Sequence, residues 1–124
     1  MQVRKLALNP VGPFTLVLGL LLLISVGCAK SPSATVRLSE FRVSPAQLNV
    51  TAGKPVTLAL INSGKIEHNW MLDHAAGVGP VHVALASGEG QTVTFTPEAI
   101  GTFRYWCTIP GHAPAGMVGT LTVE

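Results

Sequence analysis

Three residues near the C-terminus have side chains that bind soft metal ions, and they recur at equal intervals. Cys107, His112 and Met117 form the pattern C-x4-H-x4-M within a segment rich in proline and glycine. A thiolate, an imidazole and a thioether are a soft ligand set, which suits copper far better than magnesium, calcium or manganese. A fourth ligand must then come from elsewhere in the chain. His68 is the candidate, because it follows an expected strand and a turn.

This ligand set indicates a particular copper chemistry. Two histidines and one cysteine in a plane, with a weak axial methionine, form the blue-copper arrangement that transfers single electrons. A buried structural cysteine, a surface histidine and a core methionine are the plain alternatives. Each is reasonable for one residue alone, but their combination in one loop favours a metal site. We expect His74 and His82, the two remaining histidines, on the surface and Met71 in the core.

The segments around these residues have the alternation of β-strands. Apolar and polar residues alternate over residues 35–39, 56–60, 92–96, 102–107 and 120–123. Such alternation buries one face of a strand and leaves the other face wetter. Turn residues separate these segments, and no long segment has helical periodicity. We therefore expect an all-β fold, a Greek-key β-sandwich or small barrel of about 7–8 strands.

Two connecting segments lack that alternation. Residues 72–85 are interpreted as a surface loop leading into a short strand, and residues 98–100 as one helical turn. The potential ligands thus lie in loops or at strand ends, where a rigid β-scaffold can hold one geometry.

These features together resemble the cupredoxins, the small blue copper protein family, over residues 34–124. The matching motifs are His68-Asn69, Tyr105-Trp106-Cys107, Pro110-Gly111-His112 and the exit segment 119–123. The resemblance implies one bound copper ion with four ligands, His68, Cys107, His112 and Met117. It also implies that Asn69 holds the ligand loop by hydrogen bonds, as groups around metal ligands often do.

The spacing of the predicted ligands in the loop is similar to that of some cupredoxins but does not assign the chain to a subfamily. C-x4-H-x4-M is similar to the loops of rusticyanin, sulfocyanin and auracyanin, which have longer chains. Plastocyanins have a shorter gap between cysteine and histidine, and azurins have a shorter gap between histidine and methionine. The subfamily, the reduction potential and the redox partners therefore stay open.

The N-terminus has the pattern of a targeting segment. Arg4 and Lys5 precede the uncharged residues 14–26, a run that is short for a membrane-spanning helix and typical of a signal-peptide core. The run leads into Gly27-Cys28, which resembles a bacterial lipobox.

We therefore expect three regions along the chain. Residues 1–27 are a lipoprotein-type signal peptide, Cys28 carries lipid, and residues 28–33 form a tether to the domain at 34–124. A membrane anchor that is never cleaved and ordinary secretion are the alternatives. All three place the domain outside the cytoplasm, in the periplasm or at the cell surface.

The composition excludes several classes of protein. The chain has 124 residues, enough for one domain, and it is 48% hydrophobic and only 11% charged, so disorder is not expected. A net charge of +2 is too small to indicate a nucleic-acid partner. If Cys28 is lipidated, Cys107 has no disulfide partner, which is unusual in an oxidising compartment and favours another role for its thiol.

The sequence as a whole predicts an electron carrier rather than an enzyme. Four protein ligands leave no evident open position for a substrate. We expect a monomer, tethered to a membrane, that passes single electrons between transient protein partners. Residues 108–120 carry no charged side chain, so an apolar patch around His112 is the expected docking site.

Other functions fit the sequence less well. A copper chaperone or buffer is the main alternative, but such proteins tend to use surface clusters of methionine or histidine, and the chain has only three methionines. A multidomain copper oxidase needs further domains and histidines. A metal-free structural sandwich leaves the combined ligand set without a role.

Overall fold

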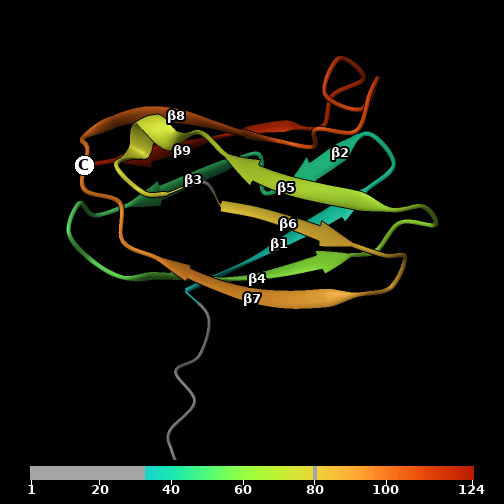
Figure 1. Cartoon of the computed structure of the whole chain (residues 1–124), viewed down its shortest axis with the longest axis horizontal. Coiled ribbons are helices and arrows are strands. Elements are labelled where there is room, and N and C mark those ends of the chain that lie inside the picture. Colours follow the sequence, from blue (N-terminus) through green and yellow to red (C-terminus); the bar gives the residue numbers. More distant parts are fainter. Residues whose placement is uncertain (1–32, 80) are drawn as a thin grey trace, which may run out of the picture.

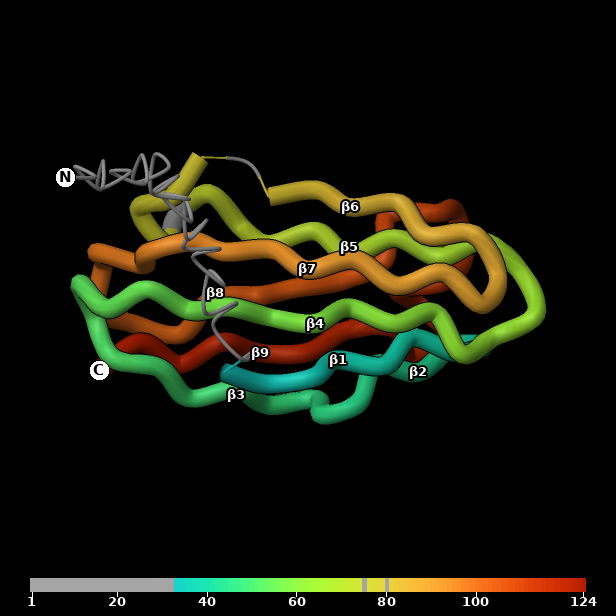
Figure 2. Tube along the Cα trace, turned by 90° about the horizontal axis from the view of Figure 1, so that it is seen from below, coloured from blue at the N-terminus to red at the C-terminus, as the bar shows by residue number. Residues whose placement is uncertain are grey.

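Two β-sheets form the part of the chain that the computed structural model describes, residues 33–79 and 81–124. In chain order the elements are β1 (Ala34–Ser39), β2 (Arg42–Ser44), β3 (Gln47–Val50), β4 (Val56–Asn62), β5 (His68–Leu72), the 3-10 helix η1 (His74–Ala76), β6 (Val81–Leu85), β7 (Gly90–Phe95), β8 (Gly101–Trp106) and β9 (Val118–Val123). One sheet has the order β2-β1-β4-β7 and the other the order β3-β9-β8-β5-β6 (Figure 1). The strands of both sheets run along the length of the molecule (Figure 2).

The pairing confirms an all-β sandwich and adds short strands to the expected set. Most neighbours are antiparallel, but β1 pairs with β4, and β3 with β9, in parallel. Strands β2 and β3 flank Pro45 and belong to different sheets. Proline has no backbone N–H to donate to a ladder, so the chain changes sheets there and one edge segment becomes two short strands. The described residues therefore contain nine strands rather than 7–8.

Strand β5 lies inside its sheet, between β8 and β6, and begins at His68. Its pattern HNWML does not alternate, because four of its five residues are buried. A strand covered on both faces loses the period of two that sequence analysis relies on. His68, the one predicted ligand outside the C-terminal loop, therefore lies on a buried strand.

The two irregular segments had different outcomes. Residues 72–85 form the expected connection into a short strand, with η1 on the way to β6. The helical turn expected at residues 98–100 is wrong. The backbone N–H groups of Glu98 and Ala99 both donate to the carbonyl of Ala76, at 3.2 and 3.3 Å, so this segment is held by η1 instead of by a local helical bond.

Aromatic rings fill the centre of the core. Trp70 is fully buried, and its ring centroid lies 5.6 Å from that of Tyr105 and 6.2 Å from that of Phe95. Phe95 belongs to the first sheet and the other two residues to the second. These contacts join the two layers next to the strands that carry the predicted ligands.

Met71 is not a core residue, so that prediction is wrong. It is half-buried, and its partners in the strand register are His82 and Trp106. Its neighbours in β5, Trp70 and Leu72, are fully buried, and successive side chains of a strand point to opposite faces. His74 and His82 are exposed, as expected.

The N-terminal predictions lie outside the described residues. They concern the signal segment 1–27, Cys28 and nearly all of the tether. Within the described part of the chain, no helix has the length and apolar character needed to cross a membrane.

Candidate metal centre

Three connections meet at the end of the sandwich that lies away from the C-terminus (Figure 1). They are the β1–β2 turn at Glu40 and Phe41, the β4–β5 loop at residues 63–67, and the β8–β9 loop at residues 107–117. The last of these carries Cys107, His112 and Met117, and the second leads directly into His68. Residues far apart in the sequence are therefore presented by one end of the fold.

Backbone hydrogen bonds fold the β8–β9 loop back on itself. The N–H of Cys107 donates to the carbonyl of Met117, and the N–H of Met117 donates to the carbonyl of His112, both at 3.1 Å. The N–H of His112 in turn donates to the carbonyl of Ile109 at 3.0 Å. These backbone hydrogen bonds therefore bring the three predicted ligands of the loop close together.

Three donor atoms converge at this point. The Nδ1 atoms of His68 and His112 are 3.2 Å apart, and Cys107 Sγ lies 3.5 Å from His112 Nδ1. One donor atom from each of these residues lies within 4.8 Å of the others. His68 and Cys107 are fully buried and His112 is 8% exposed, while Met117 beside them is fully buried as well. A buried group of this kind can hold a metal ion out of contact with water.

The state of the histidines fits a soft cation. Burial lowers the pKa of His68, and the neighbouring His112 lowers it further, although Glu40 opposes the shift. The imidazole is therefore neutral at neutral pH and has a lone pair to offer. Its Nε2 atom is buried without a hydrogen-bond partner among the described residues. Two imidazoles and a thiol facing one another are the donor set that copper prefers.

Asn69 connects the two strands that carry the cluster. Its side-chain amide donates to Thr108 Oγ1 at 2.9 Å, and its Oδ1 accepts the backbone N–H of Thr108 at 2.7 Å. The backbone N–H of Asn69 points at Cys107 Sγ, 3.5 Å away. Asn69 therefore fixes the start of the ligand loop against β5 and provides a donor to the sulfur.

Two residues of the β1–β2 turn contact the histidines and were not expected from the sequence. Glu40 Oε1 lies 3.9 Å from His68 Nε2. The Phe41 ring meets the His112 ring edge-on, with centroids 5.4 Å apart. The sequence offers no local signal for either contact, because both depend on how distant turns meet.

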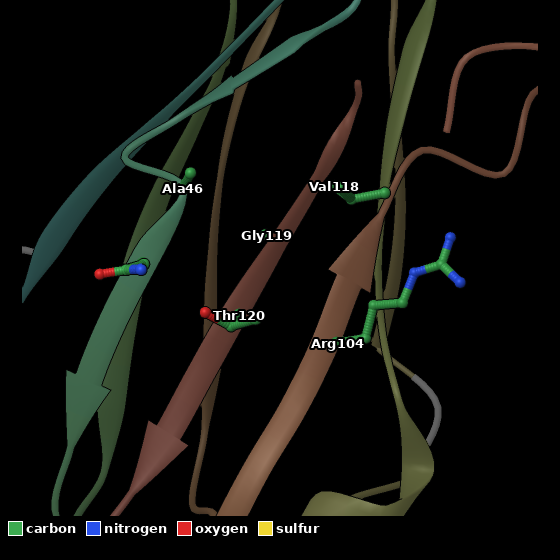
Figure 3. Close-up of a pocket in the computed structure, with 6 residues that line it drawn as sticks. Ala46, Arg104, Val118, Gly119 and Thr120 are labelled. Atoms are coloured by element: carbon green, nitrogen blue, oxygen red, sulfur yellow. The ribbon is translucent and has the colours of Figure 1, made fainter. Parts of the chain in front are cut away.

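A separate pocket lies beside β8 and β9 (Figure 3). Its volume is about 450 Å³, and it is lined by Ala46, Gln47, Arg104, Val118, Gly119 and Thr120. None of the predicted copper ligands lines this pocket. The donor cluster is thus packed among protein atoms rather than facing that cavity.

The family comparison agrees with the geometry. A family model described as a cupredoxin-like domain matches residues 14–123. The chain belongs to the cupredoxins. The all-β sandwich and the grouping of two histidines and a cysteine at one end are what the resemblance led us to expect.

Individual relatives place this cupredoxin near two kinds of protein. It is 30% identical to the copper-resistant cuproprotein CopI of Rubrivivax gelatinosus, over 79% of this chain and 71% of CopI. It is 34% identical to auracyanin-B of Chloroflexus aurantiacus, over 76% of this chain but only 54% of that relative, so the chain spans about half of auracyanin-B. The crystal structure of reduced auracyanin from Roseiflexus castenholzii superposes with a TM-score of 0.64, at 26% identity, over 73% of this chain and 95% of that one.

Family and donor set together confirm copper as the predicted cofactor. The structure brings His68, Cys107 and His112 together, with Met117 beside them. The roles of the individual residues as ligands stay a prediction.

Proposed function

We propose that this cupredoxin carries single electrons through one copper ion held by His68, Cys107, His112 and Met117. The observation that supports it most is the group of three buried donors within 4.8 Å of one another. Bound there, copper supplies a one-electron Cu(II)/Cu(I) couple. A carrier takes one electron from a donor protein and releases it to an acceptor, so no bond in the protein is made or broken.

The surrounding residues suit this task because they keep one geometry. The β8–β9 loop is closed by its own hydrogen bonds, and Asn69 ties it to β5. The N–H of Asn69 stabilises negative charge on the Cys107 sulfur. Burial of all four side chains excludes water and leaves little room for a substrate. We therefore propose a carrier and not an enzyme.

Electrons would pass through the edge of the molecule near His112. His112 is 8% exposed, and Phe41, whose ring packs against it, is 47% exposed. Residues 108–120 carry no charged side chain. We propose that transient redox partners dock on this apolar surface and that the protein works as a monomer, because such encounters are small and short-lived.

We also propose that the domain works outside the cytoplasm, attached to a membrane through lipid on Cys28 or through residues 1–27. The apolar run and the cysteine after it support this. Mass spectrometry of the protein from its native membrane tests it, because lipidation at Cys28 requires cleavage before that residue and adds the mass of the acyl chains.

A second function has one specific observation in its favour. CopI, a copper-resistant cuproprotein, matches most of this chain. A role in copper handling would require copper to leave the site or to be taken up easily. The packed donors fit slow exchange better, so we place this function second.

A visible absorption spectrum tests the proposed function. Residues 29–124 are loaded with Cu(II) and then reduced with ascorbate. We expect an intense blue or green copper–thiolate band that bleaches on reduction and is absent from Cys107→Ala. Copper binding without that band would contradict the electron-carrier proposal and favour copper handling.

A further inference from the structure

The β1–β2 turn is a strained element packed against the metal centre. Only Glu40 and Phe41 separate the paired residues Ser39 and Arg42. Phe41 has φ of 58°, which is rare for a bulky residue and persists only where the surroundings enforce it. One of those surroundings is Gly116 of the ligand loop, where an added Cβ would lie 2.9 Å from the Phe41 carbonyl oxygen.

The strained turn presents the Glu40 side chain to the loop before His68. Glu40 Oε1 accepts the backbone N–H groups of Lys65 and Ile66, the second at 3.3 Å. These hydrogen bonds hold the pKa of the Glu40 carboxyl below its usual range, so the group is ionised at neutral pH. The two hydrogen bonds keep the carboxylate near this loop, while its side chain, 40% exposed, still has room to adjust.

The same loop is held from its other side as well. The Asn62 side chain donates to the carbonyls of Ile66 and Leu85 and accepts the N–H of Gly64, over 2.8 to 3.0 Å. Ser87 Oγ donates to the Gly64 carbonyl at 2.7 Å. Hydrogen bonds from both sides therefore hold the loop that leads into His68.

The Glu40 carboxylate lies beside the one ring nitrogen of His68 that lacks a partner. Nε2 is buried with no hydrogen bond among the described residues, and Glu40 Oε1 is 3.9 Å away. Gly64 keeps this gap open, because a Cβ there would lie 2.8 Å from Glu40 Oε1 and 3.0 Å from His68 Nε2. A histidine that binds metal through one nitrogen usually donates the other N–H to a carboxylate, a carbonyl or water.

We propose that Glu40 is the positioning residue of His68, accepting its Nε2–H, directing Nδ1 toward Cys107 and His112, and lowering the reduction potential of the bound copper. The inference rests on the proposed function for its redox part. It requires Oε1 to approach Nε2 by about 1 Å from the present distance, to reach hydrogen-bonding range. A nearby negative charge favours Cu(II) over Cu(I), because the Coulomb energy grows with the charge of the ion.

The reduction potential tests the role of the charge. The full chain in detergent is loaded with copper as wild type, Glu40→Gln and Glu67→Gln. Glu40→Gln keeps the shape and the acceptor oxygen but removes the charge. Glu67→Gln removes the same charge from an exposed residue next to His68 in the chain. We expect Glu40→Gln to shift the ratio of Cu(II) to Cu(I) affinity about tenfold in favour of Cu(I), which raises the reduction potential by about 59 mV. Glu67→Gln should shift the potential far less. Equal shifts would overturn the proposal.

A second measurement needs no copper. Long-range ¹H–¹⁵N NMR spectra of the metal-free full chain show which nitrogen of His68 carries the proton and how fast that proton exchanges. We expect it on Nε2 in wild type, and about tenfold faster exchange in Glu40→Ala, the effect of losing one hydrogen bond. Unchanged exchange would overturn the positioning role. If wild type lacks the copper–thiolate band while this NMR result holds, the proposed function fails and the contact between Glu40 and His68 stands.

Discussion

Among single residues, Asn69 combines two tasks at the metal centre. Its side chain both donates to and accepts from Thr108, and its backbone N–H points at the Cys107 sulfur. The first pair of bonds fixes the position of the residue after the cysteine. The contact between the Asn69 N–H and the Cys107 sulfur depends on the position of Thr108, because the sulfur must stay within reach of the N–H. Stability and metal binding should therefore weaken together when the side chain is removed.

Replacing Asn69 by alanine should lower both stability and copper affinity. The change removes two part-buried hydrogen bonds to Thr108, each of which contributes about 0.5–1.5 kcal/mol to the unfolding free energy. Loss of a group that orients metal ligands lowers metal affinity roughly 10–100-fold. Urea unfolding of the metal-free protein measures the first effect, and copper titration against a chelator measures the second.

Asn49→Ala is the matched control, because Asn49 is an exposed asparagine of β3. Its unfolding free energy should stay within about 0.5 kcal/mol of wild type. If Asn69→Ala retained wild-type copper affinity, the hydrogen bonds to Thr108 would be shown to serve the fold alone.

How far the site could be predicted depended on where its residues lie in the chain. Cys107, His112 and Met117 share one loop, so their spacing already carries much of the geometry. His68 was found because it follows an expected strand and a turn, and the family motif His68-Asn69 agrees with that choice. Glu40 was missed, since a glutamate in a turn looks like any solvated charge until the loop before His68 is packed against it.

Among the elements, the pairing of β8 with β9 sets the two ends of the ligand loop. Tyr105 pairs with Gly119 in this ladder, and Trp106 pairs with Val118. The Tyr105 hydroxyl donates to the Pro45 carbonyl at 2.7 Å, which fixes the ring. Burial raises the pKa of Tyr105 to about 12, so the phenol keeps its proton at neutral pH. The ring packs directly against Gly119, where an added Cβ would lie 2.2 Å from its nearest atom.

Gly119→Ala should therefore destabilise the domain by about 1–3 kcal/mol, the usual cost of overfilling a packed core. Tyr105 cannot move away without losing its hydrogen bond to Pro45. Thermal and urea unfolding of the metal-free protein measure the effect. The copper–thiolate band should also shift, because the displaced ladder ends directly beside Cys107 and Met117.

Gly90→Ala in β7 serves as the comparison, because a Cβ there meets nothing closer than 3.5 Å. We expect its stability to stay within about 0.5 kcal/mol of wild type. Equal stability of the two variants would mean that the Tyr105 ring yields more easily than its contacts imply.

The elements could be predicted where one face of a strand is wet. The burial patterns of β1 and β9 alternate, and both were expected from the sequence. Strand β5 was missed because burial on both faces removes the alternation. The segment at residues 98–100 looked helical from its composition, but a distant carbonyl, that of Ala76, takes its N–H groups.

At the scale of the whole molecule, the net charge and the exposed apolar residues determine how two proteins meet. The chain has a small net charge of +2, so long-range steering toward a partner is weak. Residues 108–120 carry no charged side chain, and Phe41 next to them is 47% exposed. Apart from the Glu40 carboxylate in the same turn as Phe41, an encounter at the surface around His112 is therefore governed by short-range apolar contact.

A positive charge placed on this end should slow electron exchange between two copies of the protein. Ala115 is exposed in the ligand loop, and Ala115→Lys puts like charges opposite each other when two such ends meet. We expect the self-exchange rate, measured by NMR line broadening in mixtures of reduced and oxidised protein, to fall roughly tenfold at low salt. The rate should recover as added salt screens the repulsion, while the absorption spectrum stays unchanged.

A second variant shows whether the position of the added charge matters, or only the net charge. Thr51 is exposed just after β3, whose last residue pairs with Val123 near the C-terminus, at the other end of the sandwich. Thr51→Lys adds the same charge there, so its self-exchange rate should stay near that of wild type. If both variants slowed self-exchange equally, the effect would come from net charge alone. The surface around His112 would then not be the docking site. If only Ala115→Lys slowed self-exchange, electrons would leave the protein at the end where the buried donors come closest to solvent.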